Sequence, residues 1–244
     1  MSHILSWAHA RGIVTGEFQH GQNDPTNSAY NLGPGLLTND EFSNLRPRYL
    51  LLYGRAFCER VRTGSQSVVI GNPHFDSRAR AFRSLPRPPA QKVLVVSQGT
   101  HTHVLVALTG ELARRCPDRL FMFRLHPGEV PFRERYQRLE GIPNVEISTR
   151  GDIYDCLAVA SAVVGHSSTT LFEAVGLGLP AFIYQDEASR LMVPDGLGEW
   201  FTSVDDLISL LLSPRLPSSG DAYFAGDWQS RYREFVASVG AVPR

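Results

Sequence analysis

The second half of the chain alternates short aliphatic runs with amphipathic stretches, and this alternation constrains the fold more than any other feature. The first run, Lys92–Ser97, is closed by the turn residues Ser-Gln-Gly-Thr. Such runs are typical of strands that are buried in a parallel sheet. The next stretch, Val104–Arg115, places its aliphatic side chains on one helical face and ends at Pro117. The pair predicts one strand–helix unit.

Similar units follow along the chain as far as residue 184. We expect strands at Leu120–Leu125, Val145–Ser148, Ala162–Gly165 and Ala181–Tyr184, and helices at Pro131–Leu139, after the N-cap residue Asp152, and at Thr169–Val175. Strict alternation of this kind predicts an α/β fold with a doubly wound parallel sheet.

The first 90 residues contain three further strand candidates, at Ile13–Phe18, Tyr49–Tyr53 and Val68–Gly71. Open sheets more often have four to six strands, so we expect this lobe to be incomplete. Either the chain is a fragment or a second chain completes the lobe. The predicted organisation is an N-terminal remnant at 1–76, a basic and proline-rich linker at 77–90, a C-terminal lobe at 91–215 and a closing segment at 216–244.

The composition excludes several classes of protein. The 24 basic and 24 acidic side chains balance, which argues against a nucleic-acid partner. Three widely spaced cysteines, Cys58, Cys116 and Cys156, offer neither a disulfide framework nor a metal clamp, and they predict reduced thiols in a cytoplasmic chain. We expect no signal peptide, and the longest apolar stretch is too short to cross a membrane.

The clearest functional signal lies where a predicted strand runs into small hydroxyl residues and then into a helix. Ser167, Ser168 and Thr169 stand at the start of that helix, where unpaired backbone N–H groups and the helix dipole favour a phosphate. Glu173, one turn later, is a candidate partner for ribose hydroxyls. The competing interpretation is structural: these residues are ordinary helix caps, and Thr170–Glu173 fits a capping box.

The stretch Gly165–Thr169 also comes close to the nucleophile elbow of α/β-hydrolases, G-x-S-x-G. It lacks the final glycine. That fold also places its catalytic histidine after the serine, whereas His166 is the last histidine of this chain. A hydrolase triad is therefore excluded.

Two further stretches end predicted strands of the same lobe. His126 and Pro127 follow one strand, and proline keeps His126 out of helical geometry. Its imidazole is therefore a candidate to donate a hydrogen bond to a phosphate or to protonate a leaving group. Ser97, Gly99 and Thr100 follow another strand and are candidates for presenting donors to a phosphate. Ordinary loop residues would give the same patterns.

His20 ends a strand of the first lobe, in Gln19-His20-Gly21. It is a candidate general base that acts on an acceptor hydroxyl from the side opposite His126. A plain loop histidine is an equally good interpretation of its position.

Taken together, five stretches resemble a known family. They are Gln19-His-Gly21, Tyr49-Leu-Leu-Leu-Tyr-Gly54, Val69-Ile-Gly-Asn-Pro73, Leu125-His-Pro127 and Ser167-Ser-Thr-Thr-Leu-Phe-Glu-Ala174. The chain is similar to GT-B glycosyltransferases of surface and capsular polysaccharide synthesis, among them polysialyltransferases and CDP-glycerol glycerophosphotransferases. More distantly it resembles UDP-N-acetylglucosamine 2-epimerases.

The resemblance implies two Rossmann-like lobes with parallel sheets, the first incomplete, and a nucleotide-activated sugar or alditol donor as co-substrate. It implies that His126 contacts the donor phosphate, that Ser167, Ser168 and Thr169 hold phosphate oxygens, that Glu173 meets the ribose and that His20 is the acceptor base. It implies no protein-bound catalytic metal and no cofactor. It further implies a carbohydrate or lipid-linked acceptor at the inner face of the membrane.

The resemblance also extends to the closing segment, from Tyr223-Phe-Ala-Gly-Asp-Trp228 to Val236, which is similar to a terminal helix that packs back across the lobes. Two other interpretations stay open: a truncated nucleotide-binding remnant without catalysis, and a UDP-sugar 2-epimerase. An incomplete first lobe also predicts an exposed apolar edge on the strand Ile13–Phe18.

Overall fold

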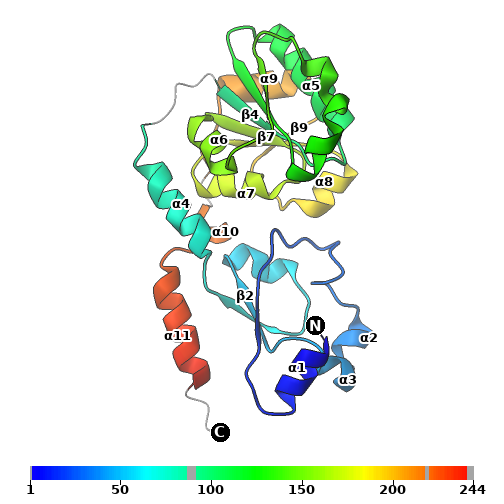
Figure 1. Ribbon diagram of the computed structural model, residues 1–244, viewed down its shortest axis with the longest axis vertical. Coiled ribbons are helices and arrows are strands. Elements are labelled where there is room, and N and C mark those ends of the chain that lie inside the picture. The colour runs from blue at the N-terminus through cyan, green and yellow to red at the C-terminus, as the bar shows by residue number, and fades with distance from the viewer. Residues whose placement is uncertain (1, 87–91, 218–219, 241–244) are drawn as a thin grey trace. The chain divides into compact units, whose positions relative to one another are not determined.

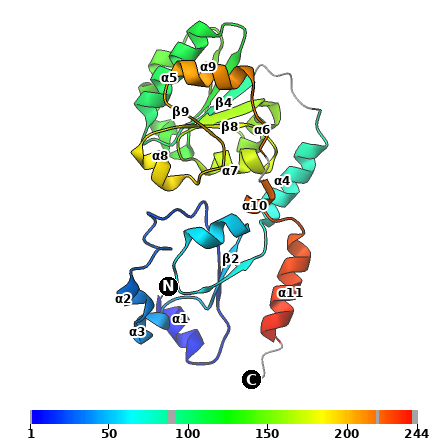
Figure 2. The ribbon, with the colours of Figure 1, turned by 180° about the vertical axis from the view of Figure 1, so that it is seen from behind.

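The computed structural model describes residues 2–86, 92–217 and 220–240, and Figures 1 and 2 show it from two opposite sides. The chain forms two compact units. The first comprises Met1–Ser77 together with Asp221–Arg244, and the second comprises Arg78–Gly220. The closing segment thus belongs to the same unit as the N-terminal part of the chain.

The second unit is built on a six-stranded parallel sheet with the order β6-β5-β4-β7-β8-β9. Its strands are β4 (Lys92–Val96), β5 (Leu120–Arg124), β6 (Val145–Ser148), β7 (Ala162–Gly165), β8 (Ala181–Tyr184) and β9 (Glu199–Phe201). Residues 93–96 of β4 are all buried, as expected of a central strand that is covered on both faces. The predicted doubly wound sheet is confirmed, and β9 adds a strand that the sequence did not reveal.

Helices cover both faces of this sheet. On one face, α5 (Thr102–Arg115), the 3₁₀ segment η2 (Pro127–Leu139) and α9 (Val204–Leu212) pack on Val93, Val95, Phe121 and Phe123 in the main hydrophobic core. On the other face, α6 (Ile153–Val159) lies against β4, and α7 (Thr169–Gly176) lies against β7 and β8. Both views draw α5 and α9 above the strands and α7 below them (Figures 1 and 2). The short helix α8 (Glu187–Met192) follows β8.

One expected helix is different in kind. The α-helix predicted at Pro131–Leu139 is a 3₁₀ segment that starts at Pro127, with a kink at Phe132 where φ is −113° and ψ is 33°. The reason is local, because Pro131 lies inside the segment and lacks the N–H that an α-helical hydrogen bond to Pro127 would need.

The first unit contains a three-stranded parallel sheet of order β1-β2-β3, formed by β1 (Gly16–Phe18), β2 (Tyr49–Leu52) and β3 (Gln66–Val69). Helix α11 (Trp228–Gly240) covers one face of this sheet. The ring of Phe235 lies edge-on to that of Tyr49, with the ring centroids 5.1 Å apart. Its other helical segments are α1 (Ser2–His9), α2 (Pro34–Leu37), α3 (Asp40–Ser43), η1 (Arg55–Arg60) and α10 (Gly220–Tyr223).

Strand β1 lies at an edge of this sheet, and Phe18 at its end is 53% exposed. Ile13, just before the strand, is 46% exposed, so apolar side chains do stand at the surface along the predicted strand Ile13–Phe18. Among the described residues, no helix is long and apolar enough to cross a membrane.

The predicted linker, 77–90, is helical in its first part. Helix α4 (Pro73–Arg83) begins directly after Asn72, whose side-chain oxygen accepts hydrogen bonds from the backbone N–H groups of His74 and Phe75. The Asn72-Pro73 pair is therefore a helix start. Residues 87–90 of the predicted linker lie outside the described part of the chain.

Candidate functional site

The strand order of the second unit defines a switch point, where the chain reverses the direction in which it adds strands. From β4 the chain winds outward through β5 and β6, then returns to place β7 on the other side of β4. The loops that follow β4 and β7 therefore diverge, one into α5 and the other into α7. Open α/β sheets bind ligands at such a switch point, outside the carboxyl ends of the strands. The predicted residues Ser97, Gly99 and Thr100 and the predicted residues Ser167, Ser168 and Thr169 lie on these two loops.

Ser168 is the N-cap residue of α7. Its backbone is extended, with φ −71° and ψ 142°, and its hydroxyl accepts a hydrogen bond from the N–H of Thr170 at 3.3 Å. The alternative capping box at Thr170–Glu173 is wrong, because Thr170 lies inside the first turn. Ser168 and Thr169 are half-buried at the helix start, where first-turn N–H groups lack helical partners and favour an anion.

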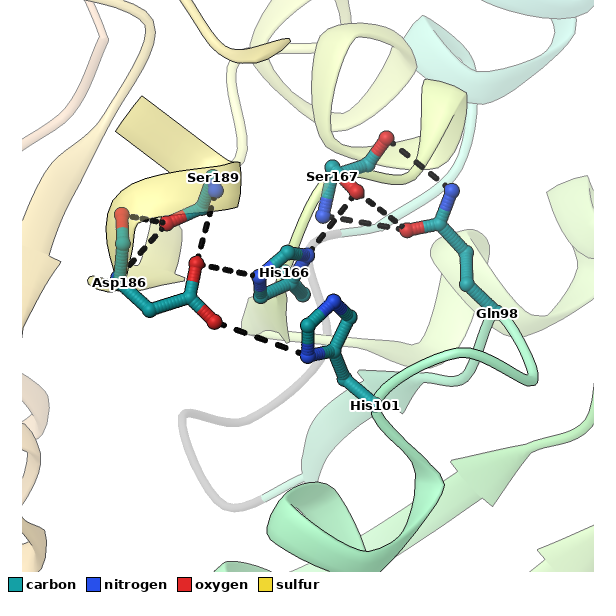
Figure 3. A network of polar contacts seen from close by, with 6 residues as sticks. All are labelled: Gln98, His101, His166, Ser167, Asp186 and Ser189. Carbon is teal, nitrogen blue, oxygen red and sulfur yellow. Dashed lines mark hydrogen bonds and ion pairs between the residues drawn. The ribbon is translucent and has the colours of Figure 1, made fainter. Parts of the chain in front are cut away.

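Ser167 has a different environment from the other two hydroxyl residues, since it is buried (Figure 3). Its N–H and its hydroxyl both donate to Oε1 of Gln98, at 3.1 and 2.9 Å, and its carbonyl accepts from Nε2 of Gln98 at 3.1 Å. Ser167 and Gln98 thereby join the loop after β7 to the loop after β4. Sequence analysis gave Gln98 no role.

A second buried side chain, Glu129, holds the loop after β4 to the loop after β5. It is 4% exposed and accepts hydrogen bonds at Oε1 from Ser97 (2.9 Å), Thr102 (3.2 Å) and the hydroxyl of Tyr136. Oε2 accepts from the backbone N–H of His126 at 2.9 Å. A buried carboxylate that accepts this many hydrogen bonds anchors the loops that carry the donors. In the sequence, the only indication of this role is that Glu129 lies three residues after the helix cap His126.

Gly99 is placed by the same anchor. Its φ is +81°, a region that favours glycine, and a Cβ there would lie 3.4 Å from Cγ of Glu129. The neighbouring Thr100 is exposed on the loop.

His126 is exposed at the N-cap of η2, with φ −63° and ψ 143°, as predicted from the proline after it. Its Nδ1 accepts a hydrogen bond from the N–H of Gly128 at 3.1 Å. A neutral ring that accepts at Nδ1 carries its proton on Nε2. Among the described residues Nε2 has no hydrogen-bond partner, so His126 can donate to a ligand without being charged.

Three side chains that sequence analysis did not connect form a cluster at the same edge of the sheet (Figure 3). Nε2 of His166 lies 2.8 Å from Oδ1 of Asp186, and Nδ1 of His101 lies 3.6 Å from Oδ2. The two imidazoles are stacked, with ring centroids 3.6 Å apart and an interplanar angle of 18°. Asp186 is the N-cap of α8 and accepts from the N–H of Ser189. His166, which mattered only as an argument against a hydrolase, is thus the centre of a polar network.

Burial and hydrogen bonding set the charges of this cluster. Burial lowers the pKa of His166; Asp186 opposes this shift and the proximity of His101 adds to it. Burial would raise the pKa of Asp186, but hydrogen bonds from Ser189 and His166 outweigh it, so that pKa is lowered. The result is a carboxylate beside a buried, neutral His166.

The same three side chains bring two nitrogens and an oxygen within 4.8 Å of one another, as metal ligands would. The stacking argues against this use. An imidazole binds a metal in its own ring plane, about 2 Å from the nitrogen. Two nearly parallel planes with centroids 3.6 Å apart cannot both contain one ion. The arrangement suits two N–H donors on one carboxylate.

Glu173 lies one turn into α7, and its Oε1 accepts a hydrogen bond from the hydroxyl of Tyr154 at 2.7 Å. Burial raises the pKa of Glu173, although the hydrogen bond from Tyr154 opposes the shift. Burial, together with the charge of Glu173, raises the pKa of Tyr154. Tyr154 was not predicted as a site residue; it orients the carboxyl that was predicted to meet the ribose.

We expect the substitution Glu173→Gln to flatten the pH dependence of stability. The pKa of Glu173 is higher in the folded than in the unfolded state, so its carboxyl favours folding at low pH and loses that contribution as pH rises through the folded pKa. Glutamine does not titrate, so the variant should gain stability relative to the parent as pH rises above about 4, the ordinary pKa of a glutamate. Urea denaturation over a series of pH values measures this. A stability difference that is constant with pH would contradict it, and Glu187→Gln, on α8, is the control.

His20 lies in the first unit, exposed after β1. The buried Gln19 fixes its loop: its Nε2 donates to the carbonyl of Gly21 and its Oε1 accepts from the N–H of Tyr53, both at 2.8 Å. Its opposition to His126 stays a prediction.

Comparison with known proteins gives a fold and no family. The sequence matches no protein-family model and no curated protein. Among solved structures, the chain resembles the UDP-GlcNAc 2-epimerase from Neisseria meningitidis with a TM-score of 0.63 and 16% identity, over 96% of this chain and 72% of that one.

Two transferases are also similar in structure. The pneumococcal O-GlcNAc transferase GtfA gives a TM-score of 0.58 and 12% identity over 99% of this chain and 55% of that one. The wall teichoic acid polymerase TagF gives a TM-score of 0.52 and 17% identity, over 92% of this chain and 62% of that one. Together with the two parallel sheets, these likenesses give the chain a GT-B-like α/β fold with Rossmann-like lobes.

Proposed function

We propose that this protein transfers a sugar or an alditol phosphate from a nucleotide-activated donor to a surface or capsular polysaccharide acceptor. The observation that carries the proposal is the switch point between β4 and β7, whose two loops lead into the N-termini of α5 and α7. The loop after the neighbouring strand β5 adds His126, whose Nδ1 accepts from the N–H of Gly128, so that Nε2 is left to donate. Helix dipoles, hydroxyls and an N–H donor are the groups that stabilise a phosphate on which negative charge develops.

Each residue then has a role on the donor. Nε2 of His126 donates to a phosphate oxygen, and the first turn of α7 at Ser168 and Thr169 binds another. The loop at Ser97, Gly99 and Thr100 presents backbone donors to the phosphates, and Ser167 holds that loop through Gln98. Glu173 accepts hydrogen bonds from the ribose. No protein-bound metal and no cofactor are required, because these groups supply the positive potential.

The remaining parts of the proposal concern the acceptor. His20 is proposed as the base that removes the proton of an acceptor hydroxyl. The acceptor is a carbohydrate or a lipid-linked saccharide, and a second chain could complete the acceptor lobe. A cytoplasmic protein at the inner face of the membrane would meet such acceptors. Support for this part comes from the sequence motifs alone.

The test of the donor site is thermal denaturation of the purified chain with CMP, CDP, UMP, UDP, GDP and ADP. A ligand at about 100 times its Kd adds roughly 2.7 kcal/mol to stability, which raises the midpoint visibly. We expect one base class to stabilise the chain, and the substitution His126→Asn to remove most of that stabilisation. Asparagine keeps an acceptor for the N–H of Gly128 while deleting Nε2. The control His20→Asn should leave the stabilisation unchanged.

Cooperative melting with no stabilisation by any nucleotide would refute the donor site. It would favour a remnant that keeps the fold without binding. Loss of stabilisation in His20→Asn would instead show that the roles of the two units are assigned wrongly.

A second candidate is a UDP-sugar 2-epimerase, favoured by the likeness to several structures of that enzyme at TM-scores of 0.60 to 0.63. Incubation with UDP-GlcNAc in deuterium oxide separates the two. Deuterium at C2 of the sugar would identify epimerase chemistry, whereas nucleotide release that depends on a saccharide acceptor would identify transfer.

A further inference from the structure

His101 lies at the edge of the sheet where the donor phosphates are proposed to bind, yet no sequence motif gives it a role. It occupies the N-cap position of α5, and its side chain is 25% exposed. Its Nδ1 faces the carboxylate of Asp186, and its ring stacks on that of His166 (Figure 3). Among the described residues its Nε2 has no hydrogen-bond partner. Nδ1 of His101 therefore faces Asp186, and Nε2 is available to contact a ligand.

The position of His101 connects it to both phosphate-binding loops. It directly follows Thr100 on the loop after β4, and it stacks on His166, two residues before the cap of α7 at Ser168. Because β4 and β7 are neighbours in the sheet, we expect an anion at the start of α7 to lie near the stacked rings.

The contact with Asp186 decides which form of His101 can bind a phosphate. A carboxylate carries no proton to donate, so Oδ2 of Asp186, 3.6 Å from Nδ1 of His101, favours the proton of the ring on that nitrogen. A neutral ring then presents a lone pair at Nε2, which repels a phosphate oxygen. The doubly protonated ring presents an N–H and a positive charge. In His126 the two nitrogens have the opposite roles. Its Nδ1 accepts a hydrogen bond from the N–H of Gly128, so a neutral ring has its proton on Nε2 and can donate it to a phosphate oxygen.

The titratable groups facing His101 are His166, from the end of β7, and Asp186, from the start of α8. His166 is 1% exposed, and burial lowers its pKa, so it stays neutral and does not oppose the charge. Asp186 remains a carboxylate, and its Oδ2, 3.6 Å from Nδ1 of His101, would form an ion pair with the ring once it takes up a proton.

We propose that His101 is a phosphate ligand of the donor site that takes up a proton when the nucleotide binds, and that Asp186 positions it through Nδ1. The ligand is a nucleoside phosphate, and the charge of the ring offsets the charge that develops on the leaving phosphate. The proposal rests on the proposed function only for the presence of a nucleotide at the switch point.

The test is isothermal titration of the full chain with UDP and CDP, and with uridine and cytidine, in two buffers of different ionisation enthalpy. We expect proton uptake with the diphosphate and none with the nucleoside. His101→Asn, which keeps a polar group opposite Asp186 and deletes Nε2, should weaken diphosphate affinity about 10- to 100-fold and abolish proton uptake. Nucleoside affinity should not change, which also shows that the variant is folded.

Two further variants sharpen the outcome. His101→Gln places an amide near Nε2 and should recover part of the affinity without proton uptake. His103→Asn, an exposed histidine on the same helix, should behave as the parent does. Equal diphosphate affinity and equal proton uptake in His101→Asn and the parent would overturn the proposal while leaving the proposed function intact. A parent that binds neither UDP nor CDP would overturn both.

The role of Asp186 is tested with Asp186→Asn, which retains a good helix cap. It should reduce proton uptake and diphosphate affinity in the parent and change neither in the His101→Asn background. Equal losses in both backgrounds would show that Asp186 acts on its own and would overturn the positioning role.

Discussion

Glu129→Ala is expected to lower the free energy of unfolding by about 3 kcal/mol or more and to weaken nucleotide binding at the same time. The carboxylate is buried and accepts from three hydroxyls and from the N–H of His126. Alanine leaves these donors without their acceptor, and leaving a buried donor unsatisfied costs about 1–3 kcal/mol. The loops after β4 and β5 should both loosen.

Denaturant titration of the second unit and hydrogen exchange at Ser97–Thr102 measure this effect. The matched control is Glu134→Ala, an exposed glutamate on the same segment, for which a change within about 0.5 kcal/mol is expected. Unchanged exchange at Ser97–Thr102 in Glu129→Ala would show that Glu129 does not anchor the loops.

Gly54→Ala is expected to destabilise the first unit by about 3 kcal/mol, the upper end for overpacking. A Cβ at Gly54 would contact the backbone oxygen of Ala222 and lie 2.5 Å from that of Tyr223, and backbone atoms cannot rotate away. The strain is steric only, since φ of −158° is ordinary extended backbone. The segment that carries Tyr223 should detach from the unit.

Limited proteolysis reads out that detachment, because the bonds after Tyr223 and Phe224 become cleavable once the segment leaves. Both side chains are buried in the parent, and Phe224 stacks on Phe75 at 3.8 Å. Gly33→Ala is the control, since nothing lies within 4 Å of a Cβ there. Equal cleavage rates in the two variants would mean that the segment is not held at Gly54.

The elements that could be predicted from sequence are those whose pattern is local. Strands β4 to β8 and the N-cap at Asp152 were readable because buried parallel strands are continuous aliphatic runs and caps are short polar signatures. Strand β9, Glu199–Phe201, has only three residues and no such run. Helix α4 was missed because its proline-rich surroundings suggested a linker, although Asn72-Pro73 is a good helix start.

The residues of the candidate site also differ in whether a local sequence pattern identifies them. His126, Ser168 and Glu173 could be proposed because each follows a strand or opens a helix. His101, Asp186 and Glu129 could not, because their roles depend on partners far away in sequence that the sheet order brings together. Thr102 is 27 residues from Glu129, and Asp186 is 85 residues from His101. Glu129 and Asp186 look like ordinary surface acids in the sequence. Only the fold shows that one is buried and that the other bridges two imidazoles.

The amide of Gln98 gives the site a property that no single binding residue provides. Its carbonyl and its NH₂ group pair with the N–H and the carbonyl of Ser167, so a side chain copies the pairing of two backbone strands. The loops after β4 and β7 are therefore held in place before a ligand arrives. Binding then loses little conformational entropy, and affinity reflects the contacts themselves. Evolution of a new ligand preference on this scaffold would have to proceed through side chains on these loops, because the backbone that carries them has little freedom to change.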